Sequence, residues 1–190
     1  NSSSVATIDI TPAPTATISY SLPEYCVSNT SVNVVISGTG AYTGGVYSSM
    51  PAGLSINSAT GEINPSLSTP NSYTVNYTIP ASGPCVSTIV STTITITPRP
   101  TVIITNNLPN ICSGSSTDIV LTSNVPGATF SWNAVGTNVS GSTNGTGTSI
   151  NQILTTTSDL VGEVVYTVIA TANGCSGDPV EVRVNINPIP

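Results

Sequence analysis

One short sequence motif occurs three times in this chain, and the spacing of its copies sets the length of the unit that can fold. The copies run over 8–14, 94–100 and 184–190, and each is an apolar/polar alternation that leads into Pro-x-Pro. Alternation at period two is typical of a half-buried strand, and proline ends a strand because it lacks an N–H. The copies begin 86 and then 90 residues apart (94 − 8 and 184 − 94). Each period therefore has the length of one small domain.

The repeat divides the chain into three segments. Residues 1–14 are expected to be the closing strand of a preceding repeat, followed by complete repeats at 15–100 and 101–190. Repeats of this length are whole domains rather than solenoid units that need neighbours to form a core. Without the preceding repeat, the strand in 1–14 has no sheet of its own. It either hangs free or adds to an exposed sheet edge of another molecule.

The four cysteines follow the same period. Cys26 and Cys112 each lie 12 residues after a Pro-x-Pro, whereas Cys85 and Cys175 each lie 15 residues before the next one. The matched offsets predict one disulfide per domain, Cys26–Cys85 and Cys112–Cys175, each joining the turn before the last strand to the segment after the first strand. Disulfides of this kind indicate an oxidising, extracellular setting. The alternative is four free thiols in a reducing compartment.

The residue pattern predicts an all-β fold. β-branched residues recur in alternation, turn residues come every 8–12 positions, and no helical periodicity is present, which favours two tandem immunoglobulin-like β-sandwich domains of about seven strands each. Asn173-Gly174 predicts a hairpin, and 140–149 predicts a flexible loop because it consists only of Gly, Ser, Thr and Asn. Trp132 is expected in the core.

Composition excludes several classes of function. Charged residues make up 5% of the chain, Lys and His are absent, the only cations are Arg99 and Arg183, and the net charge is −6. Nucleic acid is therefore a poor partner. Catalysis by a His-dependent triad, an imidazole–metal site and a Lys Schiff base are all excluded. No apolar stretch is long enough to insert into a membrane.

Acidic residues predict neither catalysis nor a strong metal site. The eight carboxylates are scattered singly along the sequence, whereas hydrolysis needs two that converge and calcium needs clustered oxygen ligands. The expectation is a chain that is not an enzyme and holds no cofactor and no metal. A weak calcium site at Asp178, beside the predicted hairpin, is the one alternative left open.

Tyrosines are the candidates for ligand contact. Tyr73 and Tyr77 lie on the apolar face of an alternating strand, so we expect them in the core. Tyr42 and Tyr47 lie among glycines, and we therefore single them out as possible exposed contacts for a polysaccharide, which usually needs an aromatic platform.

Two stretches resemble known repeat families. Residues 49–63, containing Pro51-Ala52-Gly53-Leu54 and Thr60-Gly61, resemble the bacterial putative-Ig and cadherin-like surface modules. Residues 111–114, 128–132 and 166–175 resemble the PKD-like repeats of Bacteroidetes. Both types occur in tandem in very large cell-surface proteins such as the SprB-type gliding adhesins. The resemblance implies an immunoglobulin-like fold, export by the type IX system, a place on the cell surface and a part in gliding motility.

These observations together predict a non-catalytic spacer in a giant extracellular adhesin. Its partners are expected to be the neighbouring repeats of the same chain. One alternative is that the repeats themselves bind polysaccharide or a solid surface through their Thr/Ser/Asn-rich faces. Another is an accessory module of a secreted glycoside hydrolase.

Overall fold

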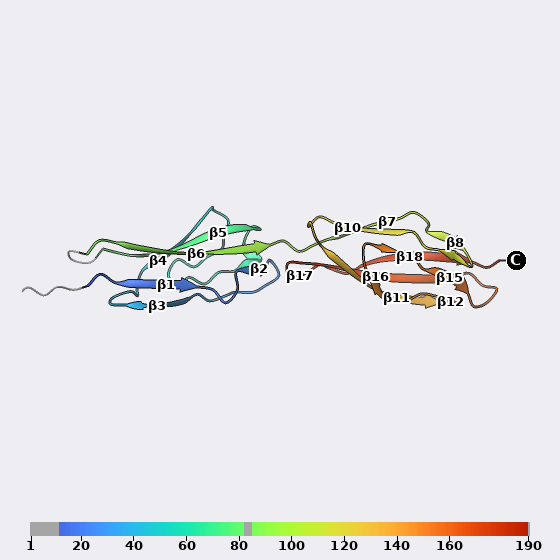
Figure 1. Ribbon diagram of the computed structural model, residues 1–190, viewed down its shortest axis with the longest axis horizontal. Coiled ribbons are helices and arrows are strands. Elements are labelled where there is room, and N and C mark those ends of the chain that lie inside the picture. The colour runs from blue at the N-terminus through green and yellow to red at the C-terminus, as the bar shows by residue number, and fades with distance from the viewer. Residues whose placement is uncertain (1–11, 82–84, 190) are drawn as a thin grey trace, which may run out of the picture. The chain divides into compact units, whose positions relative to one another are not determined.

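The computed structural model describes residues 12–81 and 85–189. The chain divides into two compact units, Asn1–Ile96 and Thr97–Pro190, called unit 1 and unit 2 below. The strand expected in residues 1–14 falls mainly on 1–11, outside the described residues. Each unit is all-β, as the sequence predicted (Figure 1).

Unit 1 contains six strands and one short 3-10 helix among its described residues. They are β1 (Thr15–Ser19), β2 (Glu24–Cys26), β3 (Val35–Thr39), β4 (Val46–Met50), η1 (Pro65–Leu67), β5 (Asn71–Ile79) and β6 (Thr88–Thr97). The longest pairing joins β5 to β6, from Asn71 opposite Ile96 to Ile79 opposite Thr88.

Two layers enclose the core of unit 1. One is a sheet in the order β2-β6-β5-β4, and the other is the antiparallel pair β1-β3 (Figure 1). Tyr73, Val75, Tyr77 and Ile79 of β5 are buried, and the residues between them are Thr and Asn. The predicted apolar face of this strand, with Tyr73 and Tyr77 in the core, is thus confirmed.

A polar turn in unit 1 also forms where the sequence predicted it. Ile56 pairs with Ile63 in an isolated bridge, and the backbone N–H of Asn57 donates to the carbonyl of Glu62 at 2.8 Å. The side chain of Asn57 accepts from the N–H groups of Ala59 and Thr60. An Asn side chain that bonds to the backbone ahead of it stabilises such a turn.

Unit 2 contains twelve strand segments among its described residues. They are β7 (Val102–Asn106), β8 (Asn110–Cys112), β9 (Ser115–Ser116), β10 (Ile119–Ser123), β11 (Thr129–Thr137), β12 (Val139–Ser140), β13 (Gly145–Thr146), β14 (Ser149–Ile150), β15 (Ile153–Thr156), β16 (Gly162–Ala172), β17 (Cys175–Ser176) and β18 (Val180–Asn187). The expected seven strands per domain are not confirmed in either unit.

The main sheet of unit 2 has the order β13-β11-β16-β18-β8, with β17 paired to β16. Two smaller sheets have the orders β14-β10-β7 and β12-β15-β9. Figure 1 shows β10 and β7 lying across from β16 and β11 of the main sheet. The predicted Asn173-Gly174 hairpin joins β16 to β17, with Ala172 opposite Cys175. Both turn residues have positive φ, 48° and 71°, as a two-residue hairpin turn of this type requires.

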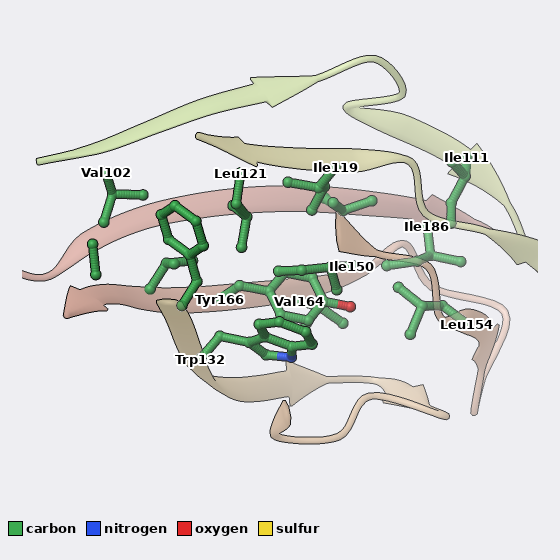
Figure 2. Close-up of a cluster of buried hydrophobic side chains, with 14 residues drawn as sticks. Val102, Ile111, Ile119, Leu121, Trp132, Ile150, Leu154, Val164, Tyr166 and Ile186 are labelled. Carbon is green, nitrogen blue, oxygen red and sulfur yellow. The ribbon is translucent and has the colours of Figure 1, made fainter. Parts of the chain in front are cut away.

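The core of unit 2 lies between these layers. Figure 2 shows Ile119 and Leu121 of β10 facing Val164, Tyr166 and Trp132 of the main sheet. Trp132 is 8% exposed, so its predicted place in the core is confirmed. Its indole N–H donates to the carbonyl of Thr143 at 3.2 Å, which satisfies the one polar atom of the ring.

The segment 140–149 is not the flexible loop that its composition suggested. Gly145–Thr146 pairs with β11 as β13, and Ser149–Ile150 pairs with β10 as β14. We call 145–150 the crossing strand, because it passes from one sheet to the other. Small polar residues are compatible with a strand when the neighbouring strands supply the hydrogen bonds, and tertiary pairing overrides their weak β propensity.

None of the helical segments in the described part of the chain has the length and apolar character that crossing a bilayer requires.

Candidate functional site

The predicted disulfide of unit 1, Cys26–Cys85, is absent, because Cys85 is a free thiol. Cys26 ends β2, which lies beside the end of β6, where the N–H of Thr95 donates to the carbonyl of Pro23. Cys85 precedes the start of β6 at Thr88. At about 3.3 Å per residue, the length of β6 places the two cysteines roughly 20 Å or more apart. A disulfide tolerates only about 7 Å between Cα atoms.

The predicted disulfide of unit 2, Cys112–Cys175, is absent for the same reason, and Cys112 is an exposed free thiol. Cys112 lies opposite Asn187 at the end of β18, whereas Cys175 lies opposite Ala172 at the end of β16. Gly162, at the other end of β16, pairs with Ile186. The length of β16, about 30 Å, therefore separates the two sulfur atoms. Cys26 and Cys175 are both disulfide-bonded.

The tyrosines singled out for ligand contact are not an exposed platform. Tyr47 is 5% exposed, and its ring centroid lies 4.5 Å from that of Tyr77. Burial, with the neighbouring Tyr77, raises the pKa of Tyr47. Tyr42 is half-buried and packs against the same core, and its carbonyl accepts a hydrogen bond from the Tyr77 hydroxyl at 2.8 Å. The prediction for Tyr47 is wrong, because Tyr47 lies on the inward face of β4, opposite Tyr77 of β5.

The segment that enters unit 2 is held against the β16–β17 hairpin. The Arg99 guanidinium donates to Asp178 Oδ1 at 2.6 Å and to the carbonyl of Ser176 at 3.1 Å. Thr97 Oγ1 lies 3.0 Å from the sulfur of Cys175. Asp178 is thus paired with a cation, and the weak calcium site considered there stays a prediction. In the described residues no group of three His, Cys, Asp or Glu could hold a metal.

Gly177 makes this close approach possible. A Cβ at Gly177 would lie 2.0 Å from the carbonyl oxygen of Pro100, far inside van der Waals contact, and the N–H of Gly177 donates to the carbonyl of Ala170 at 2.8 Å. Only glycine therefore allows the hairpin to pack on the Pro-x-Pro segment. We call this end of unit 2, where Thr97–Pro100 meets the hairpin, its entry pole.

The chain leaves unit 2 at the opposite end, which we call the exit pole. There β18 runs parallel to β8, with Asn185, Ile186 and Asn187 opposite 110–112. The N–H of Asn185 donates to the carbonyl of Pro109 at 3.0 Å, and the N–H of Ser113 donates to the carbonyl of Asn187 at 2.8 Å. The last strand is therefore bonded to the first part of the same unit just before the chain leaves it.

A polar network also joins the two layers of unit 2. The Tyr166 hydroxyl donates to Gln152 Oε1 at 3.0 Å, and Gln152 Nε2 donates to the carbonyl of Thr143 at 2.7 Å. The backbone N–H of Gln152 donates to the hydroxyl of Thr117, itself only 2% exposed. These bonds satisfy buried polar groups that would otherwise be costly, and sequence reasoning missed them because none of the residues forms a local motif.

Comparison with protein families gives a match within the second unit. Residues 109–190 match the PKD-like domain, which supports a PKD/Ig-like repeat there. No curated protein matches the chain.

Solved structures similar to the chain have immunoglobulin- or cadherin-type folds. One example is the N-terminal eight Ig domains of Down Syndrome Cell Adhesion Molecule, with a TM-score of 0.48 and 11% identity over 94% of this chain and 25% of that one. Another is Drosophila N-cadherin EC1-4, with a TM-score of 0.46 and 12% identity over 94% of this chain and 50% of that one. A SusE-like surface polysaccharide-binding protein from Bacteroides thetaiotaomicron is also similar, with a TM-score of 0.38 and 13% identity over 91% of this chain and 34% of that one. The chain spans half or less of each of these chains, and at such low identity the likeness concerns the fold alone.

Proposed function

We propose that the chain is a spacer segment of a large cell-surface adhesin and carries tension along its length. One observation carries the proposal: in each unit the chain enters at one pole and leaves at the other. In unit 2 the length of β16, about 30 Å, separates the entry-pole contacts of Gly177 from the exit-pole pairing of Ile186. In unit 1, β1 begins at one end and β6 finishes at the other (Figure 1).

The pairing of the last strand suits such a load. When the two ends of unit 2 are pulled apart, the parallel hydrogen bonds between β8 and β18 are loaded together in shear rather than opened one at a time. The side-chain bonds from Asn185 to Asn110 at 3.1 Å and from Asn106 to the carbonyl of Arg183 at 3.2 Å lie in the same region. The unit should therefore resist extension more than its small number of charged and aromatic residues suggests.

The setting that we propose is extracellular. Disulfide-bonded cysteines favour an oxidising compartment, and the resemblance to gliding adhesins suggests export by the type IX system and a part in surface attachment. A chain with two cations offers few cleavage sites to proteases that cut after Lys or Arg.

Stretching the full chain between its two ends, under reducing conditions, tests the proposal. We expect two separate unfolding peaks, each releasing about 30 nm of chain, because a unit of some 95 residues extends at roughly 3.3–3.6 Å per residue. Smooth extension without peaks would rule out a tension-bearing spacer. An accessory module of a secreted glycoside hydrolase would instead need no resistance to force.

A further inference from the structure

A pocket opens on the side of unit 2 beside the crossing strand. Its volume is about 370 Å³, within the range of about 300–1,000 Å³ that is typical of small-molecule sites. Its walls are built entirely from uncharged residues: Ala128, Thr129, Phe130, Ser131, Thr146, Gly147, Thr148 and Thr171.

The pocket exists because the crossing strand changes partners there. The N–H of Gly147 donates to the carbonyl of Phe130 in the main sheet at 3.1 Å, and one residue later the carbonyl of Thr148 accepts from the N–H of Leu121 in the opposite sheet at 2.9 Å. Gly147 has φ +131°, a conformation that favours glycine, and no atom lies within 4 Å of where its Cβ would be. The change of sheet thus leaves a hollow next to Phe130.

The chemistry of the lining is amphipathic. Ala128 supplies apolar surface, Phe130 closes the floor with only 5% of its surface exposed, and five hydroxyl-bearing residues surround them. The hydroxyl of Thr129 donates to the carbonyl of Thr171 at 3.2 Å. Within the described part of the chain, the hydroxyls of Ser131, Thr146 and Thr148 have no protein partner, so they can bond to a ligand.

We propose that this pocket binds a neutral saccharide, one or two sugar rings of a polysaccharide chain. A pyranose ring has a face of C–H groups that can pack on Ala128, because Phe130 beneath it is only 5% exposed, and hydroxyl groups at its edge that can exchange hydrogen bonds with Ser131, Thr146 and Thr148. The absence of any charge in the lining disfavours an anion, which would need a cation there.

Neither cation of the chain is free to serve that purpose. Arg99 is paired with Asp178, and Arg183 is paired with Glu163 and Glu181. An anionic group buried against this apolar, hydroxyl-lined wall would therefore lose its hydration without gaining an ion pair. The inference goes beyond the spacer role: a unit 2 that binds sugar would be a contact point as well as a length of stalk.

Calorimetric titration of the full chain tests the pocket. The probes are neutral oligosaccharides (cellohexaose, laminarihexaose, xylohexaose, maltoheptaose and chitohexaose), with polygalacturonate and heparin as anionic comparisons. We expect saturable binding of at least one neutral probe, and amide chemical-shift changes at 146–148. The double variant Thr146→Val/Thr148→Val removes two hydroxyls at constant shape, and we expect it to weaken binding about tenfold, given the modest worth of each hydrogen bond.

Thr105→Val is the matched control. Thr105 is exposed on β7, outside the pocket, so the same loss of a hydroxyl there should leave binding unchanged. Thermal unfolding followed by Trp132 fluorescence establishes that both variants are folded. Binding that the double variant does not weaken, no binding to any neutral probe at millimolar concentration, or binding to the anionic polymers alone would each overturn the proposal. The stretching experiment is independent of all these outcomes.

Discussion

Alkaline pH should destabilise unit 2 through one residue, Tyr166. Its side chain is fully buried, and burial raises its pKa from 10.0 to about 12, because the phenolate would lose its hydration. The folded state therefore keeps the proton to a higher pH than the unfolded state does. The resulting stability is fully present below pH 10 and is lost as the pH rises through about 12.

The size of the effect follows from the two pKa values. A difference of about two units corresponds to roughly 2.7 kcal/mol once both states are ionised, and to about 1.4 kcal/mol at pH 11. Trp132 is the only tryptophan in the chain and lies in the core of unit 2. Its fluorescence therefore reports the unfolding of this unit alone in the intact protein. Urea unfolding at pH 8 and pH 11 measures the difference directly.

Tyr166→Phe is the decisive control. Loss of the hydrogen bond to Gln152 Oε1 should lower stability at pH 8 by about 1 kcal/mol. The further loss between pH 8 and pH 11 should disappear, because phenylalanine does not ionise. If the variant keeps the same pH dependence as the parent chain, Tyr166 is not its source, and the reasoning from burial fails.

Three further predictions concern other parts of the chain. Gly177→Ala should destabilise unit 2 by about 1–3 kcal/mol in urea unfolding, because its methyl group must displace the Pro100 carbonyl; an unchanged midpoint would refute the close packing at the entry pole. Alkylation of the folded chain should modify the exposed Cys112 faster than the half-buried Cys85 and leave the two disulfide-bonded cysteines unmodified, as peptide mapping can check. Asn173→Val should cost about 1–2 kcal/mol, because a β-branched residue tolerates φ 48° poorly; Asn173→Gly, without that strain, should be nearly neutral.

Local patterns in the sequence predicted much of the fold. Alternation over 73–79 identified the buried face of β5, and Asn173-Gly174 identified a hairpin, because both signals depend only on neighbouring residues. Trp132 was placed in the core from its strand context. Because these signals depend only on residues close together in the chain, a single sequence is enough to identify them.

Pairings between distant segments were predicted less well. Cys112 and Cys175 were joined because their offsets match, yet they lie at opposite poles of the sandwich. The first strand of the unit runs from the entry pole to the exit pole, so the segment that follows it, with Cys112, lies at the exit pole. The last strand must also run towards the exit pole for the chain to leave there, so the turn that precedes it, with Cys175, lies at the entry pole. Strand direction, rather than spacing, decides which cysteines can meet.

The sequence alone could not predict the candidate pocket, for a related reason. Thr146, Gly147 and Thr148 belong to a stretch with no apolar periodicity, and its composition is that of a loop. Its structure comes from partners more than ten residues away, first β11 and then β10. The aromatic residue beside the hollow, Phe130, looked like an ordinary core residue, and it is 5% exposed.

The crossing strand also limits the pairing of exposed sheet edges with neighbouring chains. Unpaired strand edges invite pairing with a neighbouring chain, and multidomain chains are prone to misassembly between their domains. Lysines, the usual protection of such edges, are missing from this chain. By bonding to β11 and then to β10, residues 145–150 occupy part of the edge of both sheets with one short segment. A deletion there would expose part of both edges at once, and we expect the shortened chain to aggregate.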